Sequence, residues 1–574
     1  MNRKNFISLI IAGGGVISSV PGQCLPIFNQ PATDSSKELN GNEAFGTDLI
    51  IAGGGLGGCA AALAALRNNL KVILTEETDW IGGQLTQQGV PPDENPWIET
   101  YGGTELYREF RQAIRNYYVR NYPLTETAKA NKLLNPGDGS VSRLCHEPRV
   151  ALAVLHEMFA PYIGSGKLTL LTEHKVTDAE ISGDRVKALQ ATNLRTGDRI
   201  VLEAPYFIDA TELGDLLPLT GTEFITGTES QKDTKELHAP ENADPENNQA
   251  FTVCFAIDYD PDKNHVIEKP AEYDFWRNFK PELKPAWPGS LLDFTYPEPS
   301  TLKPETLGFH PGGISTAPLL NLWNYRRIIN KNNFSKDFYT SDITIVNWPQ
   351  NDYMAGNLIG VGEKEFKKQV NHAKQLSLSL LYWLQTEAPR PDGGKGWSGL
   401  RLRKDIMGTD DGLAKYPYIR ESRRIKALFT ILEEHVGKEN RALITGKHDG
   451  NKAFDFYDSV GIGSYNIDLH PSNKGCNYID IPSLPFQIPL GALLPVRMQN
   501  LLPANKNIGT THITNGCYRL HPVEWNIGES AGMLVAFALN RKVLPREVRE
   551  KEALLEEFTN LIRTQGIRTQ WPIV

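Results

Sequence analysis

The chain has 574 residues, enough for more than one cooperative folding unit. Its content of 40% hydrophobic and 22% charged residues is ordinary for a soluble globular protein. The net charge of −8 argues against nucleic acid as a partner, because such binding needs a basic surface that displaces counterions.

The first thirty residues are typical of a secretory signal peptide. Asn2, Arg3 and Lys4 form a polar, basic start, and the apolar run FISLIIAGGGVISSV follows it. We therefore expect export to the periplasm or beyond the cell, the alternative being a disordered apolar N-terminus. Residues 31–47 are predicted to be a flexible lead-in. No later run of 18 apolar residues occurs, so no membrane-spanning segment is predicted in the mature chain.

The hexapeptide IIAGGG occurs twice, at Ile10–Gly15 and at Ile50–Gly55. A dinucleotide-binding unit needs a strand, G-x-G-x-x-G, a helix, a second strand and an acidic residue about 20 positions on. The first copy lacks the second strand and the acid. The second copy has a strand at 49–51, a helix at 59–69, a second strand at 71–75 and then Glu76.

The second copy also has glycine at all three required positions. Gly53 permits the tight turn, Gly55 lets the backbone approach a pyrophosphate, and Gly58 lets the helix pack closely on the strand. Helix N-terminal amides suit a diphosphate. Glu76 can accept bonds from ribose hydroxyls and would repel the 2′-phosphate of NADP. The unit predicts an ADP-containing cofactor, and the predicted contacts also include Leu56, Gly57 and Glu77.

A second glycine pair follows directly in the segment TDWIGGQLT, residues 78–86. This segment resembles the glutathione-reductase-type flavoproteins and, more closely, the broad family of bacterial FAD-dependent oxidoreductases, which carry a similar xGGQLT sequence. The alternative for Gly82 and Gly83 is an ordinary turn. The resemblance implies FAD as the cofactor, with Gly83 and Gln84 near it.

Three further segments share this resemblance. Residues 142–159 look like the family's helix, and the strands that follow would place the backbone of Val176 against adenine. Residues 206–221 resemble the motif DATGxGD, although Glu212 replaces a glycine. Residues 501–539 resemble the closing flavin segment. The resemblance implies further cofactor contacts at Ala210, Thr211, Gly214, Asp215, Asn507 and a helix N-terminus formed by Asn526, Ile527 and Gly528.

The resemblance covers residues 48–110, 142–221 and 485–540 and implies an α/β, Rossmann-like fold. The FAD-binding domain would be discontinuous, comprising 48–221 and 485–544, and a substrate domain of α+β type would be inserted at 222–484. Within the insertion, the residue pattern predicts strands at 251–259 and 344–353 and an amphipathic helix at 364–387. Residues 545–574 are predicted to form a C-terminal helix.

A second G-x-G-x-x-G unit with its strands and acid is missing from the sequence. Glycines at 355–366 and 460–468 lack that architecture. We therefore expect no dedicated NAD(P)H domain. Electrons would come from a small organic substrate and leave to oxygen or another acceptor.

Oxidation at a flavin calls for a base near the substrate and a cation near the ring. The candidates for these roles are His146, Arg420, Arg519, His512 and His521, with His470 as a further histidine. Each of them could instead be a structural residue in a hydrogen bond or an ion pair. Asp410 and Asp411 are expected to form a turn, and Cys145 to be a buried, inert thiol.

Six cysteines without CxxC spacing predict no metal site, and one or two disulfides stay possible in an exported protein. The functional prediction is an FAD-dependent oxidoreductase that oxidises an amine, alcohol or sugar-like compound by hydride transfer. One alternative is an FAD enzyme with net non-redox chemistry, such as isomerisation or elimination. The other is a carbohydrate-associated binding protein that retains the fold, suggested by the aromatic-rich middle segment.

Overall fold

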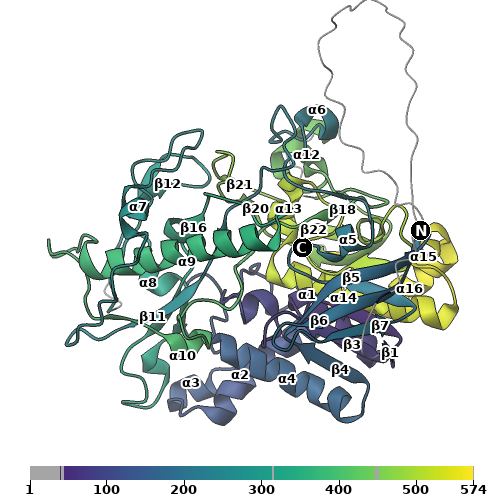
Figure 1. Cartoon of the computed structure of the whole chain (residues 1–574), viewed down its shortest axis with the longest axis horizontal. Helices are drawn as coiled ribbons and strands as arrows, with labels where there is room; N and C mark the ends of the chain where they lie inside the picture. The colour runs from purple at the N-terminus through teal and green to yellow at the C-terminus, as the bar shows by residue number, and fades with distance from the viewer. Residues whose placement is uncertain (1–38, 40–43, 313–315, 447–451, 573–574) are drawn as a thin grey trace, which may run out of the picture. The chain divides into compact units, whose positions relative to one another are not determined.

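The computed structural model describes residue 39 and residues 44–312, 316–446 and 452–572 (Figure 1). Residues 36–574 form one compact unit. The predicted signal peptide lies outside the described residues, so export stays a prediction. Within the described part of the chain, no helix is both long and apolar enough to cross a bilayer.

A five-stranded parallel sheet carries the predicted dinucleotide unit. Its strands, in spatial order, are β23 (Leu501–Pro503), β8 (Tyr206–Asp209), β2 (Leu49–Ala52), β3 (Val72–Glu76) and β4 (Leu168–Thr172). All four neighbouring pairs are parallel. Every residue of β2 and β3 is buried, as expected for parallel strands covered on both faces. The fold class and these two strands therefore agree with the prediction.

Helix α1 (Leu56–Arg67) joins β2 to β3 and packs against α14 (His521–Arg541) (Figure 1). Glycines allow the two backbones to approach. A Cβ atom on Gly528 would lie 2.0 Å from the carbonyl oxygen of Gly57, and one on Gly532 would lie 2.3 Å from that of Ala61. The first and last parts of the predicted FAD-binding region are thus joined by direct helix contact.

Other elements surround this core. The helices are α2 (Glu105–Asn121), α3 (Glu126–Ala130), α4 (Pro148–Gly164), α5 (Leu216–Leu219) and α13 (His512–Tyr518). A second sheet has the order β1 (Ala44–Gly46), β7 (Arg199–Glu203), β6 (Arg185–Asn193), β5 (His174–Ser182). Strand β1 pairs with β7, so the lead-in is ordered at least at residues 44–46.

The C-terminal segment forms two helices where one was predicted. They are α15 (Pro545–Glu550) and α16 (Glu552–Thr564). Lys551 between them is extended, with φ −107° and ψ 110°. The break separates a first helix that starts at a proline from a second, strongly amphipathic one.

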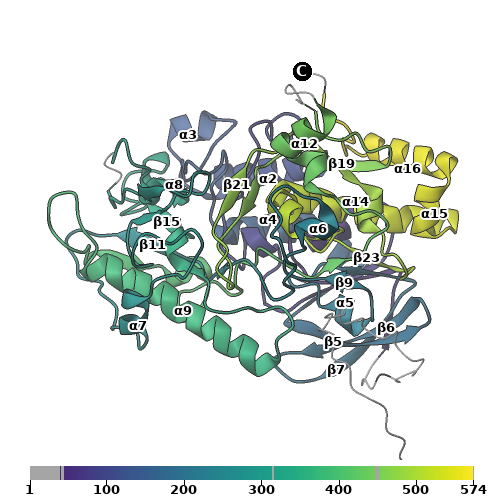
Figure 2. The ribbon, with the colours of Figure 1, turned by 90° about the horizontal axis from the view of Figure 1, so that it is seen from above.

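The middle segment has its own core, rich in aromatic residues. Its antiparallel sheet has the order β14 (Arg327–Ile329), β15 (Ile343–Val346), β11 (Phe255–Tyr259), β17 (Leu400–Leu402). The long helix α9 (Glu363–Thr386) runs alongside β11 and β15 (Figure 2) and agrees with the predicted helix within one residue at each end. Each of the two predicted strands is interrupted. The first is divided between β10 (Phe251–Thr252) and β11, and the second between β15 and β16 (Asp352–Tyr353).

Short elements complete this part of the chain. The helices are α6 (Gln231–Thr234), α7 (Tyr273–Asn278), α8 (Leu322–Tyr325), α10 (Lys404–Met407), α11 (Glu433–Val436) and α12 (Lys438–Thr445). The strands are β9 (Phe224–Ile225), β10 (Phe251–Thr252), β12 (Thr295–Pro297), β13 (Pro304–Thr306), β16 (Asp352–Tyr353), β18 (Arg424–Ile425), β19 (Ser459–Gly463), β20 (Ile467–Leu469), β21 (Ile479–Ile481) and β22 (Phe486–Pro489). All five cysteines in the described part of the chain are free thiols.

Candidate active site

The glycine loop between β2 and α1 is shaped by close backbone contacts. Gly53 has φ +95°, and a Cβ there would lie 2.3 Å from the Ala210 carbonyl oxygen. A Cβ on Gly58 would lie 2.1 Å from the carbonyl oxygen of Gly53. Gly55 differs, because a Cβ there would first meet a side-chain oxygen of Glu212, at 3.0 Å. Neighbouring backbone therefore leaves no room for a side chain at Gly53 or Gly58, whereas Gly55 is bordered by the side chain of Glu212.

Glu76 ends β3 beside this loop. Its two carboxylate oxygens accept hydrogen bonds from the backbone N–H groups of Gly54, at 3.0 Å, and Thr78, at 2.9 Å. Burial raises the pKa of Glu76 to about 8. The carboxylate is therefore held in place at the carboxyl end of the strand, where ligands bind in open α/β sheets.

A small cavity of about 30 Å³ lies at this edge of the sheet. The predicted cofactor residues that line it are Gly53, Gly55, Glu76, Glu77, Val176, Ala210, Thr211 and Asp215. The lining residues that were not predicted as contacts include Thr75, Gln87, His174, Glu212 and Tyr416. Tyr416 comes from the middle segment, where no sequence motif marks it.

Glu212 stands over the glycine loop, in the position where the related motif has glycine. Its carboxylate pairs with the ammonium of Lys506 at 2.6 Å, and Lys506 also contacts Glu524 at 3.3 Å. Burial raises the pKa of Glu524, and Lys506 opposes this rise. The Glu212 carboxylate therefore covers Gly55, and Lys506 is its cationic partner.

Polar atoms without partners also mark this region. In the described part of the chain, both side-chain amide atoms of fully buried Gln88 and the Oε1 atom of Gln84 lack hydrogen-bond partners. Both residues follow the glycine pair of the xGGQLT segment. Buried polar groups are normally paired, and the polar atoms of a flavin ring could pair with these. The glycine loop, Glu76 and these amides therefore fit FAD.

The remaining predicted cofactor residues lie around this cavity without lining it. Leu56 and Gly57 begin α1, and the Gly57 N–H donates to the Asn505 side chain at 3.1 Å. Asn507 donates to the Asp209 carbonyl oxygen at 3.0 Å, which ties the closing loop to β8. Gly83 and Gly214 both have positive φ angles, +56° and +65°.

The closing helix differs from the prediction. It begins at His521, so Asn526, Ile527 and Gly528 lie in its second turn and do not form its N-terminus. The Asn526 side chain accepts from the Ile462 N–H at 3.1 Å, and Gly528 packs on α1. Pro522, in the first turn of α14, is the sequence signal that marks the true start.

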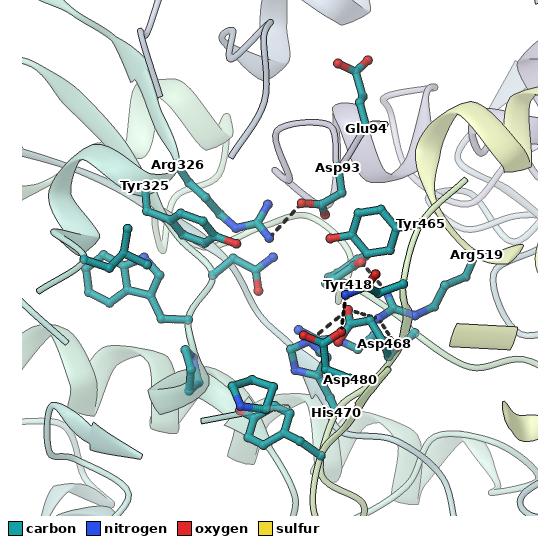
Figure 3. Close-up of a pocket in the computed structure, with 18 of the residues that line it drawn as sticks. Asp93, Glu94, Tyr325, Arg326, Tyr418, Tyr465, Asp468, His470, Asp480 and Arg519 are labelled. Atoms are coloured by element: carbon teal, nitrogen blue, oxygen red, sulfur yellow. Dashed lines mark hydrogen bonds and ion pairs between the residues drawn. The ribbon is translucent and has the colours of Figure 1, made fainter. Parts of the chain in front are cut away.

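A much larger cavity, of about 570 Å³, adjoins the FAD-binding region (Figure 3). Its lining includes Asp93 to Trp97 from the segment that follows xGGQLT, Arg519 from the closing segment, and many residues of the middle segment. Gln84 connects the two regions, because its amide donates to the Arg519 carbonyl oxygen at 3.1 Å.

Charged and aromatic side chains alternate around this cavity. Asp93 faces Arg326 at 3.3 Å on one side, and Asp468 contacts Arg519 at 2.9 Å on the other (Figure 3). The Arg519 guanidinium also donates to the hydroxyl of Tyr418 at 2.8 Å. The rings that line the cavity are Trp97, Tyr296, Tyr325, Trp348, Tyr418, Tyr465 and Tyr478.

His470, at the end of β20, belongs to a buried hydrogen-bonded group at this cavity. Its Nδ1 atom lies 2.5 Å from a carboxylate oxygen of Asp352, and Arg420 contacts the same carboxylate at 2.9 Å. Burial would raise the pKa of Asp352, but Arg420 and His470 outweigh it and hold this pKa below its ordinary value. Because the ionised carboxylate only accepts, the His470 Nδ1 carries the hydrogen, and its Nε2 faces the cavity 3.8 Å from a carboxylate oxygen of Asp468.

The predicted catalytic residues fall into two groups. Arg420 and Arg519 line the large cavity, whereas His146, His512 and His521 do not. His512 bonds to Glu421 at 2.8 Å. His521 accepts from the Asp93 N–H at 3.0 Å, and burial lowers its pKa to about 3. Burial likewise lowers the pKa of His146 to about 4, so both rings are neutral at pH 7.

Two further predictions concern metals and reactive thiols. Among the described residues, no group of three or more His, Cys, Asp and Glu side chains is placed to hold a metal ion. Asp411 instead accepts from the Leu413 N–H at 3.0 Å and pairs with Lys374. Cys145 is fully buried, and burial raises its pKa to about 12, so it is an inert thiol at pH 7.

The parallel sheet, the glycine loop and the buried Glu76 carboxyl group at the end of β3 define a dinucleotide-binding protein of the Rossmann-like class. Residues 48–561 match the model of the family described as FAD dependent oxidoreductase. The chain belongs to this family: it is an FAD-dependent oxidoreductase, and FAD is its cofactor. No curated protein shows significant sequence similarity to the chain.

Similarity to solved structures is weak. A quinol fumarate reductase from E. coli is 13% identical, with 91% of this chain and 74% of that chain covered and a TM-score of 0.31. OxyS anhydrotetracycline hydroxylase from Streptomyces rimosus is 11% identical, with 91% and 67% covered and a TM-score of 0.31. The Mycobacterium smegmatis Sdh1 complex is 11% identical over 29% of this chain and only 34% of that chain, with a TM-score of 0.21. None of these similarities carries an argument about this protein's chemistry.

Proposed function

We propose that the protein oxidises a sugar-like, polyhydroxylated alcohol in the large cavity by hydride transfer to FAD. The observation that supports this most is the cavity's mixture of aromatic faces with carboxylate, amide and guanidinium groups. Aromatic rings offer apolar faces with polar edges, which suit the C–H face of a sugar ring. Carboxylates and amides suit neighbouring hydroxyl groups.

An alcohol suits this cavity better than an amine. An ammonium group would need an ionised, unpaired carboxylate, but Asp93 and Asp468 are each paired with an arginine, and Glu94 is paired with Arg111. Asp480 accepts a hydrogen bond from the Asn466 side chain at 2.8 Å, and burial raises its pKa, which disfavours the ionised form. The volume of about 570 Å³ falls within the usual range for small-molecule sites.

His470 is the proposed base. When bound, FAD supplies the two-electron chemistry by accepting a hydride from the substrate carbon. The hydroxyl proton of the same carbon passes to the Nε2 atom of His470, so the alcohol becomes a carbonyl compound. Asp352 keeps the Nδ1 hydrogen in place, and Arg420 keeps Asp352 ionised. Oxygen or another acceptor would be needed to reoxidise the bound cofactor.

The substitution His470→Gln tests this assignment. Loss of a general base typically lowers kcat by a factor of about 100 to 10,000. We expect such a loss with FAD content unchanged, because His470 does not line the cofactor cavity.

The variant His512→Gln is a suitable control, since His512 lies outside the large cavity. A fully active His470→Gln enzyme would contradict the assignment of the base. That result would not test the proposed substrate class, which is tested separately by whether sugars reduce FAD.

A further inference from the structure

A second aromatic cavity lies next to the large one and shares a wall with it. Its volume is about 580 Å³, and its aromatic and proline lining consists of Trp97, Tyr101, Phe454, Pro485, Trp571 and Pro572. Trp97 also lines the large cavity. A ligand that occupied both cavities would therefore contact the same indole ring on its way from one to the other.

Trp97, Tyr101 and Trp571 form one aromatic cluster. The ring centroids of Trp97 and Trp571 are 5.4 Å apart with an edge-on arrangement, and Trp97 stacks on Tyr101 at 6.3 Å. All three side chains are partly exposed. Partly exposed aromatic rings retain free faces on which a ligand can stack.

The C-terminal segment that carries Trp571 is fixed in place. The indole N–H of Trp571 donates to the Phe486 carbonyl oxygen at 2.8 Å. Two residues earlier, the Thr569 carbonyl oxygen accepts from Ser459 at 2.7 Å and from Gln487 at 2.9 Å. The ring is thus held in a defined orientation, which reduces the entropy cost of binding a ligand.

The second cavity carries little net charge. Its charged lining residues, Lys452 and Asp455, pair with each other. An acidic or basic polymer would find no excess of opposite charge here. Aromatic faces without net charge favour a neutral ligand with flat, weakly positive C–H faces and a hydroxylated rim, the properties of a pyranose ring.

We infer that the second cavity binds the adjoining residues of a neutral oligosaccharide whose reacting residue occupies the large cavity. This inference rests on the proposed function, because the large cavity is the proposed site of the sugar residue that reacts. The shared Trp97 wall and the paired charges favour a glycan over a charged peptide. The protein would then act on the end of a sugar chain in preference to a free monosaccharide.

Binding measurements with the FAD-loaded protein test this directly. Isothermal titration would compare cellohexaose, xylohexaose, mannohexaose and maltohexaose with their monosaccharides. We expect at least one hexasaccharide to bind roughly tenfold more tightly than its monosaccharide, as an added stacking contact would provide. The substitution Trp571→Ala should bring that ratio close to one. Tyr457→Ala is the control, since Tyr457 is an exposed aromatic outside the lining and should leave the ratio unchanged.

The outcomes separate the two proposals. Equal affinities for hexasaccharides and monosaccharides, or a ratio unaffected by Trp571→Ala, would overturn the second cavity as a glycan site. Because these are binding data, they do not depend on turnover. If the ratio behaves as expected but no sugar reduces FAD, then the proposed oxidation fails while the glycan site stands.

Discussion

Glu76 couples the glycine loop to the predicted ribose site through a single carboxylate. It accepts two backbone hydrogen bonds and is almost completely buried. The substitution Glu76→Ala removes an acceptor for a ribose hydroxyl and loosens the loop at Gly54. Since leaving a buried hydrogen-bonding group unpaired costs about 1–3 kcal/mol, we expect FAD affinity to fall roughly tenfold.

Titration of the apoprotein with FAD, followed by flavin fluorescence, measures this change. Glu157→Ala is the matched control, because Glu157 forms a half-exposed surface pair with Arg120. Wild-type FAD affinity in Glu76→Ala would show that the carboxylate does not contact the cofactor.

His521 links stability to pH. Burial lowers its pKa from about 6.5 to about 3, so between these values the unfolded chain binds a proton that the folded protein does not. The stability that His521 contributes is complete above pH 6.5 and is lost as the pH falls. The slope for one such proton is about 1.4 kcal/mol per pH unit.

The variant His521→Gln lacks this titration. The unfolding free energy of the wild type minus that of His521→Gln should decrease by about 2 kcal/mol when the pH falls from 6.5 to about 5. Burial raises the pKa values of Glu76 and Glu236, so these groups change stability with pH in the opposite sense. Both are present in the wild type and in the variant, so their effect cancels in the difference. Denaturant unfolding at several pH values measures the difference, and a constant difference would contradict the neutral, buried state.

At the level of elements, the close packing of α1 and α14 joins the two ends of the FAD-binding region. Gly532 faces the Ala61 carbonyl oxygen, and an added Cβ would lie only 2.3 Å from it. The substitution Gly532→Ala must therefore push the helices apart. Overpacking of this kind costs about 1–3 kcal/mol, so we expect a lower melting temperature.

Gly164→Ala is the control for this substitution. A Cβ on Gly164, at the end of α4, would have no neighbour within 4 Å. The melting temperatures of both variants, measured with saturating FAD, show whether the added methyl group at position 532 destabilises the protein. Equal melting temperatures would show that the helix contact can relax without cost.

For the whole molecule, local patterns predict the dinucleotide unit well. Strands β2 and β3, the glycine loop and Glu76 lie within about thirty residues, and each is specified by its near neighbours. The helix at 364–387 was also predictable, because its apolar period continues over its length.

The large cavity was much less predictable. His470 and Asp352 are 118 positions apart, and Thr252 and Arg420, which also contact Asp352, come from strand β10 and from the loop before β18. Trp571 reaches the aromatic cluster from the far end of the chain. Such contacts depend on tertiary packing between distant segments, and no short sequence motif encodes them. The misplaced start of α14 is different, since Pro522 could have indicated it.

The central claim is that this FAD-dependent oxidoreductase takes electrons from a polyhydroxylated substrate in the cavity lined by His470 and Arg519. Anaerobic mixing of the FAD-loaded protein with a panel of sugars, sugar alcohols and amines tests it most directly. We predict that one or more sugars or sugar alcohols bleach the visible absorbance of FAD, and that His470→Gln slows this bleaching. If FAD stays oxidised with every sugar, or only amines reduce it, the account of the substrate site is contradicted.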